Sequence, residues 1–357
     1  MTIAYLIDYN LNDDSGVIQK IKQQSSQWTK KGHTVYFVST KTMSIYDADY
    51  NVIAKKKPLD LNFGRFGTAI KLLYHSYALY GLLQEIEFDL IYMRYRMYMP
   101  FFSKITKRYK VVMEINSDDK LEYSLHSKVT NIYNRLTRNL LLKNIDAFVS
   151  VSNELKERFN YLGKPIEVIA NGINTKEYEV KSNVNKVPTL VFIGTPNQPW
   201  HGLDKILEMA KHFKEYQFYI IGTKGKDTEN IKYFGYLTKE DATKIINRSD
   251  IGIGTLSLYK KGLTEASPLK TRQYLACGLP LIYAYKDTDF DSDVEFGLQL
   301  DNSENNIEYE RIEAFVKKVF NNKNIRKLAR TFAVTQLDYE IKEEKRLKFF
   351  KRVLDES

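Results

Sequence analysis

Residues 265–282 read EASPLKTRQYLACGLPLI, a stretch that combines helix start and stop signals with charged side chains. The hydroxyl of Ser267 at the N-cap and Pro268 at the first helical position predict a helix start, and the later Gly-Leu-Pro predicts its end. Lys270 then falls in the first turn, where a lysine and free backbone N–H groups can hold a phosphate. Glu265, just before the helix, is placed to hydrogen-bond sugar hydroxyls. The stretch therefore predicts a site for a nucleotide-sugar.

Strand-like and helix-like segments alternate along the rest of the chain, which is typical of parallel α/β sheets. Apolar runs in the first half predict the strands Ile3–Asp8, Thr34–Ser39, Leu90–Met93, Lys110–Ile115, Ala147–Val151 and Ile166–Ile169. Helical periodicity between them predicts the helices Val17–Lys31, Gly67–Glu85, Asn131–Lys143 and Asn153–Tyr161. The second half predicts the strands Thr189–Ile193, Gln217–Gly222 and Ile251–Thr255 and the helices Gly202–His212 and Asp338–Leu354.

The length of 357 residues favours two domains, each with its own core. Residues 176–188 are polar and rich in lysine and asparagine, which is typical of an interdomain linker. We expect an N-terminal domain over 1–175, a C-terminal domain over 189–335, and a C-terminal helix over 336–357 that packs back on the N-terminal domain. Both domains are expected to be Rossmann-like, with parallel sheets that face an interdomain cleft.

The loops at the carboxyl ends of the predicted strands are the expected ligand-binding segments, because ligands of open parallel sheets bind there. These loops are 9–16, 116–120, 194–201 and 256–270. Each contains glycine, asparagine or charged residues. Segments that are far apart in the sequence are therefore expected to line the same cleft.

The composition is that of a soluble globular protein. The single cysteine, Cys277, excludes an intramolecular disulfide and is typical of a reducing compartment. No secretory signal pattern opens the sequence, and no uninterrupted apolar run approaches the length that spans a bilayer. A cytoplasmic location is expected, with the cytoplasmic face of a membrane as a second possibility.

The positive charge is concentrated in the first half of the chain. Residues 1–187 hold 27 Lys and Arg against 19 Asp and Glu, whereas residues 188–357 hold 27 against 25. Such an excess attracts anionic lipid headgroups, nucleic acid or phosphorylated substrates. Solvated surface lysines explain any single cluster equally well.

Motifs in the order of a known family extend over most of the chain: Ser15-Gly16-Val17, Gly32-His33-Thr34-Val35, Asp89 to Arg94, Asn171-Gly172-Ile173, Gly194 with Pro199 to Asp204, and Glu265 to Gly278. Together they resemble the family 4 retaining glycosyltransferases, which have the B-type two-domain (GT-B) fold. The resemblance implies transfer of a sugar from a nucleoside diphosphate sugar to an acceptor hydroxyl with retention. The implied setting is the synthesis of a cell-surface polysaccharide or glycolipid.

The resemblance also implies roles for individual residues and partners. The implied catalytic residues are Glu265, Lys270 and Asn116. The implied donor-binding residues are Gly16, Gly194, Thr195, His201, Ser267, Pro268, Leu269 and Gln273. The expected partners are a nucleoside diphosphate sugar, a glycan or lipid-linked glycan acceptor and an anionic membrane surface, but no nucleic acid. No cofactor is expected, and the five scattered histidines predict no metal site.

Five positions depart from the family pattern. Asn116 lies in a loop where many relatives have a histidine, and Asn174 stands where the family has an aspartate. Gln273 stands where the family has a second glutamate, although an amide oxygen can still accept a hydrogen bond from a ribose. Thr195 and His201 stand where the family often has a basic pair. These departures leave open a non-catalytic partner of a glycosyltransferase, or a nucleotide-sugar epimerase of the same fold. A nucleic-acid-binding protein is suggested by charge alone and lacks a recognition motif.

Several residues allow two interpretations. Gly16 either lets a phosphate approach the backbone or simply starts a helix. Arg94 either binds an anionic group or pairs with a neighbouring carboxylate. Residues 67–85 form an apolar, tyrosine-rich helix, which is interpreted as packed against the first sheet in preference to a membrane interface.

Overall fold

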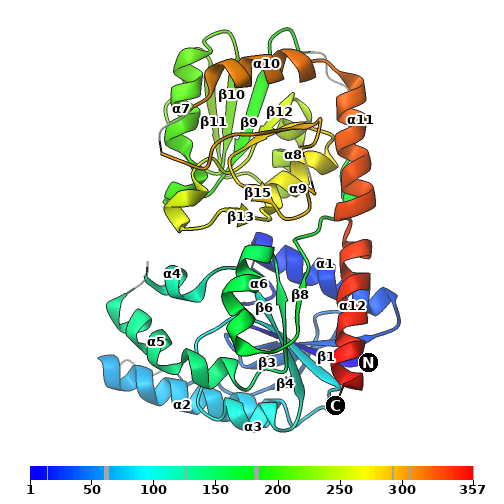
Figure 1. The fold of residues 1–357 in the computed structure, drawn as a ribbon. Helices are drawn as coiled ribbons and strands as arrows, with labels where there is room; N and C mark the ends of the chain where they lie inside the picture. Colours follow the sequence, from blue (N-terminus) through cyan, green and yellow to red (C-terminus); the bar gives the residue numbers. More distant parts are fainter. Residues whose placement is uncertain are drawn as a thin grey trace. The chain divides into compact units, whose positions relative to one another are not determined.

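The computed structural model describes residues 1–13, 15–59, 64–124, 127–180, 185–291, 293–304 and 307–356. The chain divides into two compact units, of which the first contains Met1–Ile169 and Glu343–Ser357 and the second contains Ala170–Lys342. Each unit is built around its own largely parallel sheet with helices packed on it (Figure 1). The prediction of an α/β protein with two Rossmann-like sheets is confirmed.

The first unit contains an eight-stranded sheet in the order β4-β3-β2-β1-β5-β6-β7-β8. Six of its strands are parallel: β1 (Thr2–Ile7), β2 (Thr34–Ser39), β5 (Leu90–Arg94), β6 (Lys110–Ile115), β7 (Ala147–Ser150) and β8 (Ile166–Val168). At one end of the sheet, β3 (Ser44–Tyr46) pairs antiparallel with β2, and the edge strand β4 (Val52–Lys55) pairs antiparallel with β3. The expectation of a purely parallel sheet missed them, because strands this short carry too little periodicity to detect.

Helices cover both faces of the first sheet: α1 (Gly16–Lys30), α2 (Gly64–Leu82), α3 (Phe102–Thr106), α4 (Asp119–Ser124), α5 (Lys128–Leu142), α6 (Asn153–Phe159) and the later part of α12 (Tyr339–Asp355). Helices α1 and α12 share one face. There the ring centroids of Trp28 and Phe350 lie 5.6 Å apart, and those of Phe350 and Tyr92 lie 5.2 Å apart. The end of the chain therefore completes the core of its beginning.

The second unit contains a six-stranded sheet in the order β11-β10-β9-β12-β14-β16. All of its paired strands are parallel: β9 (Thr189–Ile193), β10 (Gln217–Ile221), β11 (Ile231–Gly235), β12 (Ile251–Ile253), β14 (Leu281–Tyr283) and β16 (Gly297–Gln299). A separate parallel pair joins β13 (Glu265–Ala266) and β15 (Lys286–Asp287). The helices are α7 (Leu203–His212), α8 (Lys239–Asn247), α9 (Leu269–Ala276), α10 (Tyr309–Val319) and α11 (Lys323–Phe332).

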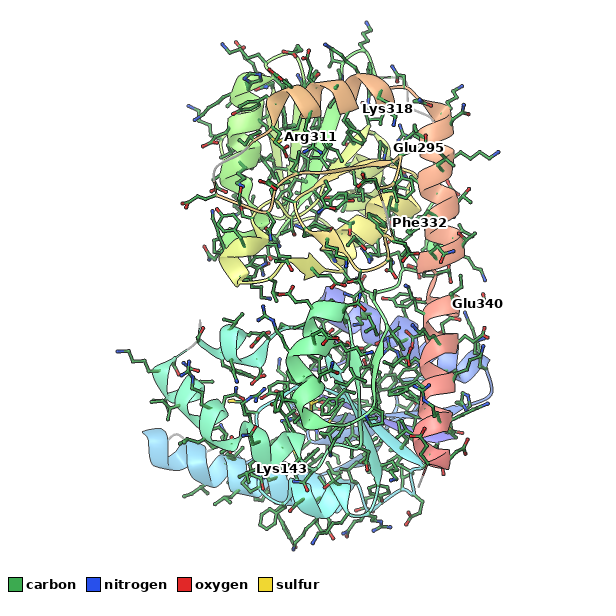
Figure 2. The ribbon with its side chains drawn as sticks, viewed as in Figure 1. Lys143, Glu295, Arg311, Lys318, Phe332 and Glu340 are labelled. Atoms are coloured by element: carbon green, nitrogen blue, oxygen red, sulfur yellow. The ribbon has the colours of Figure 1, made fainter. Side chains whose placement is uncertain are left out.

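Aromatic rings join α11 to the body of the second unit. Phe332, labelled on α11 in Figure 2, lies with its ring centroid 5.3 Å from those of Phe290 and Phe296. Because these rings come from a loop and from the residue before β16, they fix the helix against the sheet.

The described residues of the predicted linker, 176–180 and 185–188, lie within the second unit. Glu177 forms a salt bridge with Lys239 of α8, and Arg330 of α11 donates a hydrogen bond to the Thr175 carbonyl at 2.9 Å. These bonds attach the segment before residue 180 to the second unit. Residues 181–184, also part of the predicted linker, lie outside the described residues.

Candidate functional site

Helix α9 begins at Leu269, one position later than predicted, with Pro268 at its N-cap. The prediction that Ser267 caps the helix is wrong. The Ser267 hydroxyl instead accepts the backbone N–H of Asn171 at 2.8 Å, and the Asn171 side-chain amide donates to the Ser267 carbonyl. Pro268 makes no side-chain capping hydrogen bond to the first turn of α9. The positive end of the helix dipole at this turn favours an anion.

Lys270 extends from this first turn into a covered position. Its Nζ atom is shielded from solvent and has no hydrogen-bond partner among the described residues. The ammonium lies 4.3 Å from the centroid of the Phe192 ring. Burial lowers the pKa of Lys270 to about 7. A buried cation without a counter-ion is unfavourable, so the site favours an anionic ligand.

His201 and Gly194 lie beside Lys270. The Nδ1 atom of His201 is also buried without a hydrogen-bond partner among the described residues. Burial, and then the charge of Lys270, lower the pKa of His201 to about 3, so its imidazole is neutral near pH 7. A Cβ on Gly194 would stand 2.4 Å from the Phe192 ring and 2.7 Å from the His201 Nδ1 atom. Gly194 is thus needed for the close approach of these two side chains.

The remaining predicted residues of the second unit have different settings. Glu265 is buried on β13, and its backbone lies opposite that of Lys286 in the parallel pair with β15. Thr195 is exposed just after β9. The Nε2 atom of Gln273 donates to the Thr243 hydroxyl of α8 at 3.5 Å. The structure thus brings Gly194, His201 and Lys270 together, and it holds Gln273 against α8.

Two further lysines in the loop before β13, Lys260 and Lys261, could also bind a phosphate, but both already have partners. Lys260 forms a salt bridge with Asp204 at 2.9 Å. The Nζ atom of Lys261 lies 5.0 Å from the Trp200 ring centroid. Of the lysines considered, Lys270 alone therefore has an ammonium nitrogen that is buried without a hydrogen-bond partner in the described part of the chain.

Arg272 positions α9 and was not predicted. Its side chain is fully buried, and its guanidinium donates to Asp287 at 2.8 Å, to Asp289 at 2.7 Å and to the Asn171 carbonyl at 3.2 Å. These bonds hold α9 against β15 and against the segment that contains Asn171, the residue to which Ser267 is also bonded. No sequence motif marks Arg272, because its carboxylate partners follow 15 and 17 residues later.

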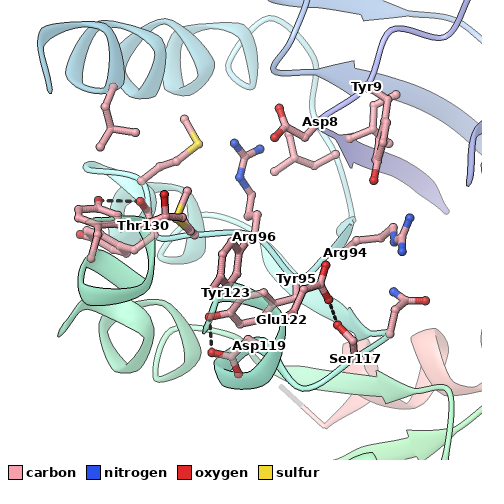
Figure 3. A pocket seen from close by; sticks show the side chains of 18 of the residues that line it. Asp8, Tyr9, Arg94, Tyr95, Arg96, Ser117, Asp119, Glu122, Tyr123 and Thr130 are labelled. Atoms are coloured by element: carbon pink, nitrogen blue, oxygen red, sulfur yellow. Dashed lines mark hydrogen bonds between the residues drawn. The ribbon is translucent and has the colours of Figure 1, made fainter. Parts of the chain in front are cut away.

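The first unit contains a cavity of about 610 Å³ at the carboxyl ends of β1, β5 and β6 (Figure 3). Side chains from these strand ends and from α2, α4 and α5 line it. Asn116, a predicted catalytic residue, is among them and accepts a hydrogen bond from Lys20 at 3.3 Å. Gly16, a predicted donor-binding residue, does not line this cavity. It is the exposed first residue of α1, which Ser15 caps.

A buried ionic cluster lies behind this cavity at the end of β6. Glu114 is fully buried and accepts hydrogen bonds from Lys20 at 2.6 Å and from the Tyr92 hydroxyl. Arg346 of α12 lies 3.4 Å from the Glu114 carboxylate. Burial opposes ionisation of Glu114, but the charges of Lys20, Arg346 and Arg94 hold its pKa well below the usual value. The cluster fixes α1 and α12 to the strand that leads to Asn116.

Neither a metal cluster nor a membrane span is found in the described part of the chain. No three His, Cys, Asp or Glu side chains lie close enough there to hold a metal ion. None of the described helices is long and apolar enough to cross a bilayer.

Two family models match the sequence. The Glycosyltransferase Family 4 model matches residues 15–177, and a glycosyl transferase-like model matches residues 203–337. No curated protein matches the chain.

Solved structures share the fold at low identity. Sucrose-phosphate synthase from Thermosynechococcus elongatus matches with a TM-score of 0.77 and 13% identity, over 100% of both chains. A glycosyltransferase from Rickettsia africae has a TM-score of 0.71 and 14% identity, over 100% of this chain and 99% of that one. The HepE protein of Anabaena, in complex with UDP and glucose, has a TM-score of 0.64 and 14% identity, over 99% and 100%.

Proposed function

The chain belongs to glycosyltransferase family 4, and on that premise we propose that it transfers a sugar from a nucleoside diphosphate sugar to an acceptor hydroxyl with retention of configuration. The observation that carries the proposal is the buried Lys270 ammonium, which has no hydrogen-bond partner among the described residues, at the uncapped start of α9. A diphosphate supplies the missing negative charge. The complex of HepE with UDP and glucose supports this class of donor.

The charges suggest how the second unit would promote the reaction. As the glycosidic bond breaks, negative charge develops on the diphosphate and positive charge on the sugar ring. Lys270 and the N–H groups of α9 would stabilise the diphosphate, because fixed dipoles and charges act most strongly where water is excluded. Glu265 would hold the sugar hydroxyls, and Gln273 the ribose. In this proposal the leaving phosphate accepts the acceptor proton on the same face of the sugar, without a metal or cofactor.

The first unit would bind the acceptor, a glycan or lipid-linked glycan, in the cavity beside Asn116. A membrane contact is proposed for the exposed surface of α5. Val129, Ile132, Leu136 and Leu140 recur at helical spacing on this surface, and Leu136 is 75% exposed. Leu73 and Tyr77 of α2 are exposed as well.

The charge of these two helices favours an anionic membrane. Neither the α2 sequence nor the α5 sequence contains an acidic residue. Lys128 and Arg135 of α5 are exposed, and Lys143 follows the end of this helix, where Figure 2 labels it. Apolar side chains flanked by cations are typical of helices that lie in a membrane interface. These features support our proposal that the protein works at the cytoplasmic face of a membrane, in polysaccharide or glycolipid synthesis.

A thermal-shift screen tests the donor site. Wild type, Lys270→Ala and the exposed α7 control Lys211→Ala are compared with UDP, GDP, ADP, CDP and dTDP and their common sugars. A ligand that binds only the folded state raises the melting temperature by mass action. We expect one nucleotide family to stabilise wild type and the control but not Lys270→Ala. No shift with any nucleotide would favour the non-catalytic partner, and donor conversion without an acceptor would favour the epimerase.

A flotation assay tests the membrane surface. Wild type is expected to bind vesicles of phosphatidylglycerol and phosphatidylcholine, but not vesicles of phosphatidylcholine alone. The double variant Ile132→Ser/Leu136→Ser should lose most of this binding, because it removes apolar area worth about 25 cal/mol per Å². Leu328→Ser, an exposed leucine of the second unit, serves as the control. Equal binding by both variants would refute the proposed surface.

A further inference from the structure

Two arginines line the cavity of the first unit. Arg94 is the last residue of β5, and Arg96 follows two positions later (Figure 3). The Nη1 atom of Arg94 and the Nε atom of Arg96 are buried and have no hydrogen-bond partner among the described residues. Buried guanidinium nitrogens usually bind carboxylate or phosphate oxygens, so these two atoms need an explanation.

Arg96 has a nearby carboxylate that balances its charge. Its Nη1 atom donates to the Thr40 hydroxyl at 3.1 Å, and that hydroxyl donates to Asp8 at 2.6 Å. Asp8 is also the carboxylate whose charge acts most strongly on Arg96. Arg96 and Asp8 therefore form an indirect pair through Thr40.

Arg94 has no carboxylate to itself. It belongs electrostatically to the cluster behind the cavity, where its charge acts on both Glu114 and Lys20. In that cluster Lys20 pairs with Glu114 at 2.6 Å, and Arg346 pairs with Glu343 at 2.8 Å. Both carboxylates are thus matched by other cations. The positive charge of Arg94 is therefore left without a matching carboxylate in this cluster.

The other acidic residues of the cavity do not neutralise Arg94. Asp119 binds Arg138 at 2.8 Å and accepts a hydrogen bond from the Tyr95 hydroxyl. Glu122 is exposed and accepts a hydrogen bond from Ser117, so solvent screens its charge. Among the described residues, the cavity wall therefore carries one uncompensated positive charge, at Arg94.

Asn116, Ser117 and Thr130 add uncharged polar groups to the wall. Another part of the wall is apolar or aromatic and includes Leu72, Met97, Tyr98, Met99, Val129 and Tyr133. Such surfaces pack against the hydrophobic faces of sugar rings or against short aliphatic groups. A ligand that satisfies the whole cavity combines such a face with one anionic group.

We propose that the acceptor of this enzyme carries a negatively charged group, a phosphate or a carboxylate, which Arg94 binds in the cavity of the first unit. This inference rests on the proposed function, because it assigns the cavity to the acceptor. It adds the chemical class of that acceptor. Neutral glycans leave the Arg94 charge without a partner and bind less tightly.

Calorimetric titration of the full chain, without nucleotide, tests the proposal. Four probes separate the contribution of the sugar ring from that of the anionic group: glucose, glucose 6-phosphate, glucuronate and inorganic phosphate. We expect glucose 6-phosphate or glucuronate to bind at least about tenfold more tightly than glucose, because an anion–guanidinium bond is charge-assisted. Which of the two prefers the site distinguishes a phosphate-bearing from a carboxylate-bearing acceptor. Inorganic phosphate should bind more weakly than glucose 6-phosphate, because it lacks the sugar face.

Three variants locate the effect. Arg94→Met should abolish the preference for the charged probe, Arg94→Lys should retain part of it, and Arg108→Met, an exposed arginine outside the cavity, should leave it unchanged. The melting temperature of each variant reports whether it folds. If glucose binds as tightly as the anions, or if the preference survives in Arg94→Met, the proposal is wrong.

Nucleotide binding separates this inference from the proposed function. A nucleotide that stabilises both wild type and Arg94→Met, with no preference among the sugar probes, would refute the charged acceptor and leave the enzyme assignment intact. A preference that depends on Arg94, without nucleotide binding, would support the anion site and contradict the proposed reaction.

Discussion

Lys270 couples ligand binding to protonation. Its pKa is about 7 in the unliganded protein, so its side chain is mostly neutral at pH 8. A bound diphosphate favours the ammonium form and raises this pKa. Nucleotide binding at pH 8 should therefore take up close to one proton, and affinity should decrease as the pH rises above 7. Calorimetric titrations in Tris and in HEPES, whose ionisation enthalpies differ, measure this uptake.

The matching controls remove either the phosphate or the amine. The nucleoside without phosphates should bind with no proton uptake, and Lys270→Met should lose the uptake together with most of the affinity. A charge-assisted hydrogen bond contributes about 1.5–3 kcal/mol, or roughly 10- to 150-fold in affinity. Nucleotide binding without proton uptake at pH 8 would show that Lys270 does not contact the phosphates.

Loss of the Arg272 guanidinium should strongly destabilise the second unit. Arg272→Met leaves Asp287, which is 2% exposed, without its cation, while Asp289 keeps Lys342. Removal of one partner of a buried ion pair costs about 3–5 kcal/mol. Urea denaturation should show this loss, whereas the exposed control Arg248→Met should change stability by less than about 0.5 kcal/mol. Equal stability of the two variants would contradict the structural role of Arg272.

The contrast between Lys270 and Arg272 shows what a sequence reveals about individual residues. Lys270 stands at a fixed position in a local pattern of proline, lysine and glycine, so its place in the first turn was predictable. Arg272 and Arg94 act through partners that are distant in the sequence. The charge balance that leaves Arg94 in excess depends on α1, β6 and α12 together, and no local motif contains it.

Strands and helices were predictable where an apolar run has clear boundaries. Strands β2, β6 and β9 have the predicted bounds, because polar or turn residues flank each run. The pair β13 and β15 was missed, because two residues carry no periodicity. The start of α9 was shifted by a tertiary bond: Ser267 binds Asn171, almost a hundred residues away, in preference to the helix.

Strand β12 provides a prediction at the scale of an element. It lies between β9 and β14, and a Cβ on Gly252 would stand 2.4 Å from the Tyr274 ring. The Tyr274 hydroxyl also accepts the backbone N–H of Ile193 at 2.8 Å, so the ring has little freedom to move. Gly252→Ala should therefore lower the free energy of unfolding by about 1–3 kcal/mol.

Gly81 of α2 is the control for this substitution. A Cβ there meets only the Lys56 Cε atom, at 3.9 Å. Gly81→Ala should be neutral or stabilise the protein by up to about 1 kcal/mol, because alanine is the better helix former. Chemical denaturation of both variants measures the difference. Equal effects would mean that the Tyr274 ring moves aside without cost.

At the scale of the whole molecule, the chain forms two units with separate cores. Its last residues, from Glu343 on, belong to the first unit. The motif order predicted two Rossmann-like sheets, but composition gave no sign that the first unit ends at Ile169. That boundary follows from hydrogen bonds that attach residues 171–177 to α9 and α11. Thr175 also donates to Asp338, the residue before α12. Such bonds depend on the folded second unit and leave no pattern in the linker itself.

This division predicts that the two units unfold in distinguishable steps. Phe350 is fully buried against Trp28 and Tyr92 of the first unit, so Phe350→Ala should cost that unit about 3–5 kcal/mol. A nucleotide at 100 times its dissociation constant should stabilise the second unit by about 2.7 kcal/mol. In scanning calorimetry, Phe350→Ala should lower one transition while the nucleotide raises the other. Ile312→Ala, fully buried in α10, should lower the transition that responds to the nucleotide. A single transition that moves with all three changes would show that the units unfold cooperatively, and that the returning helix transmits stability across the whole chain.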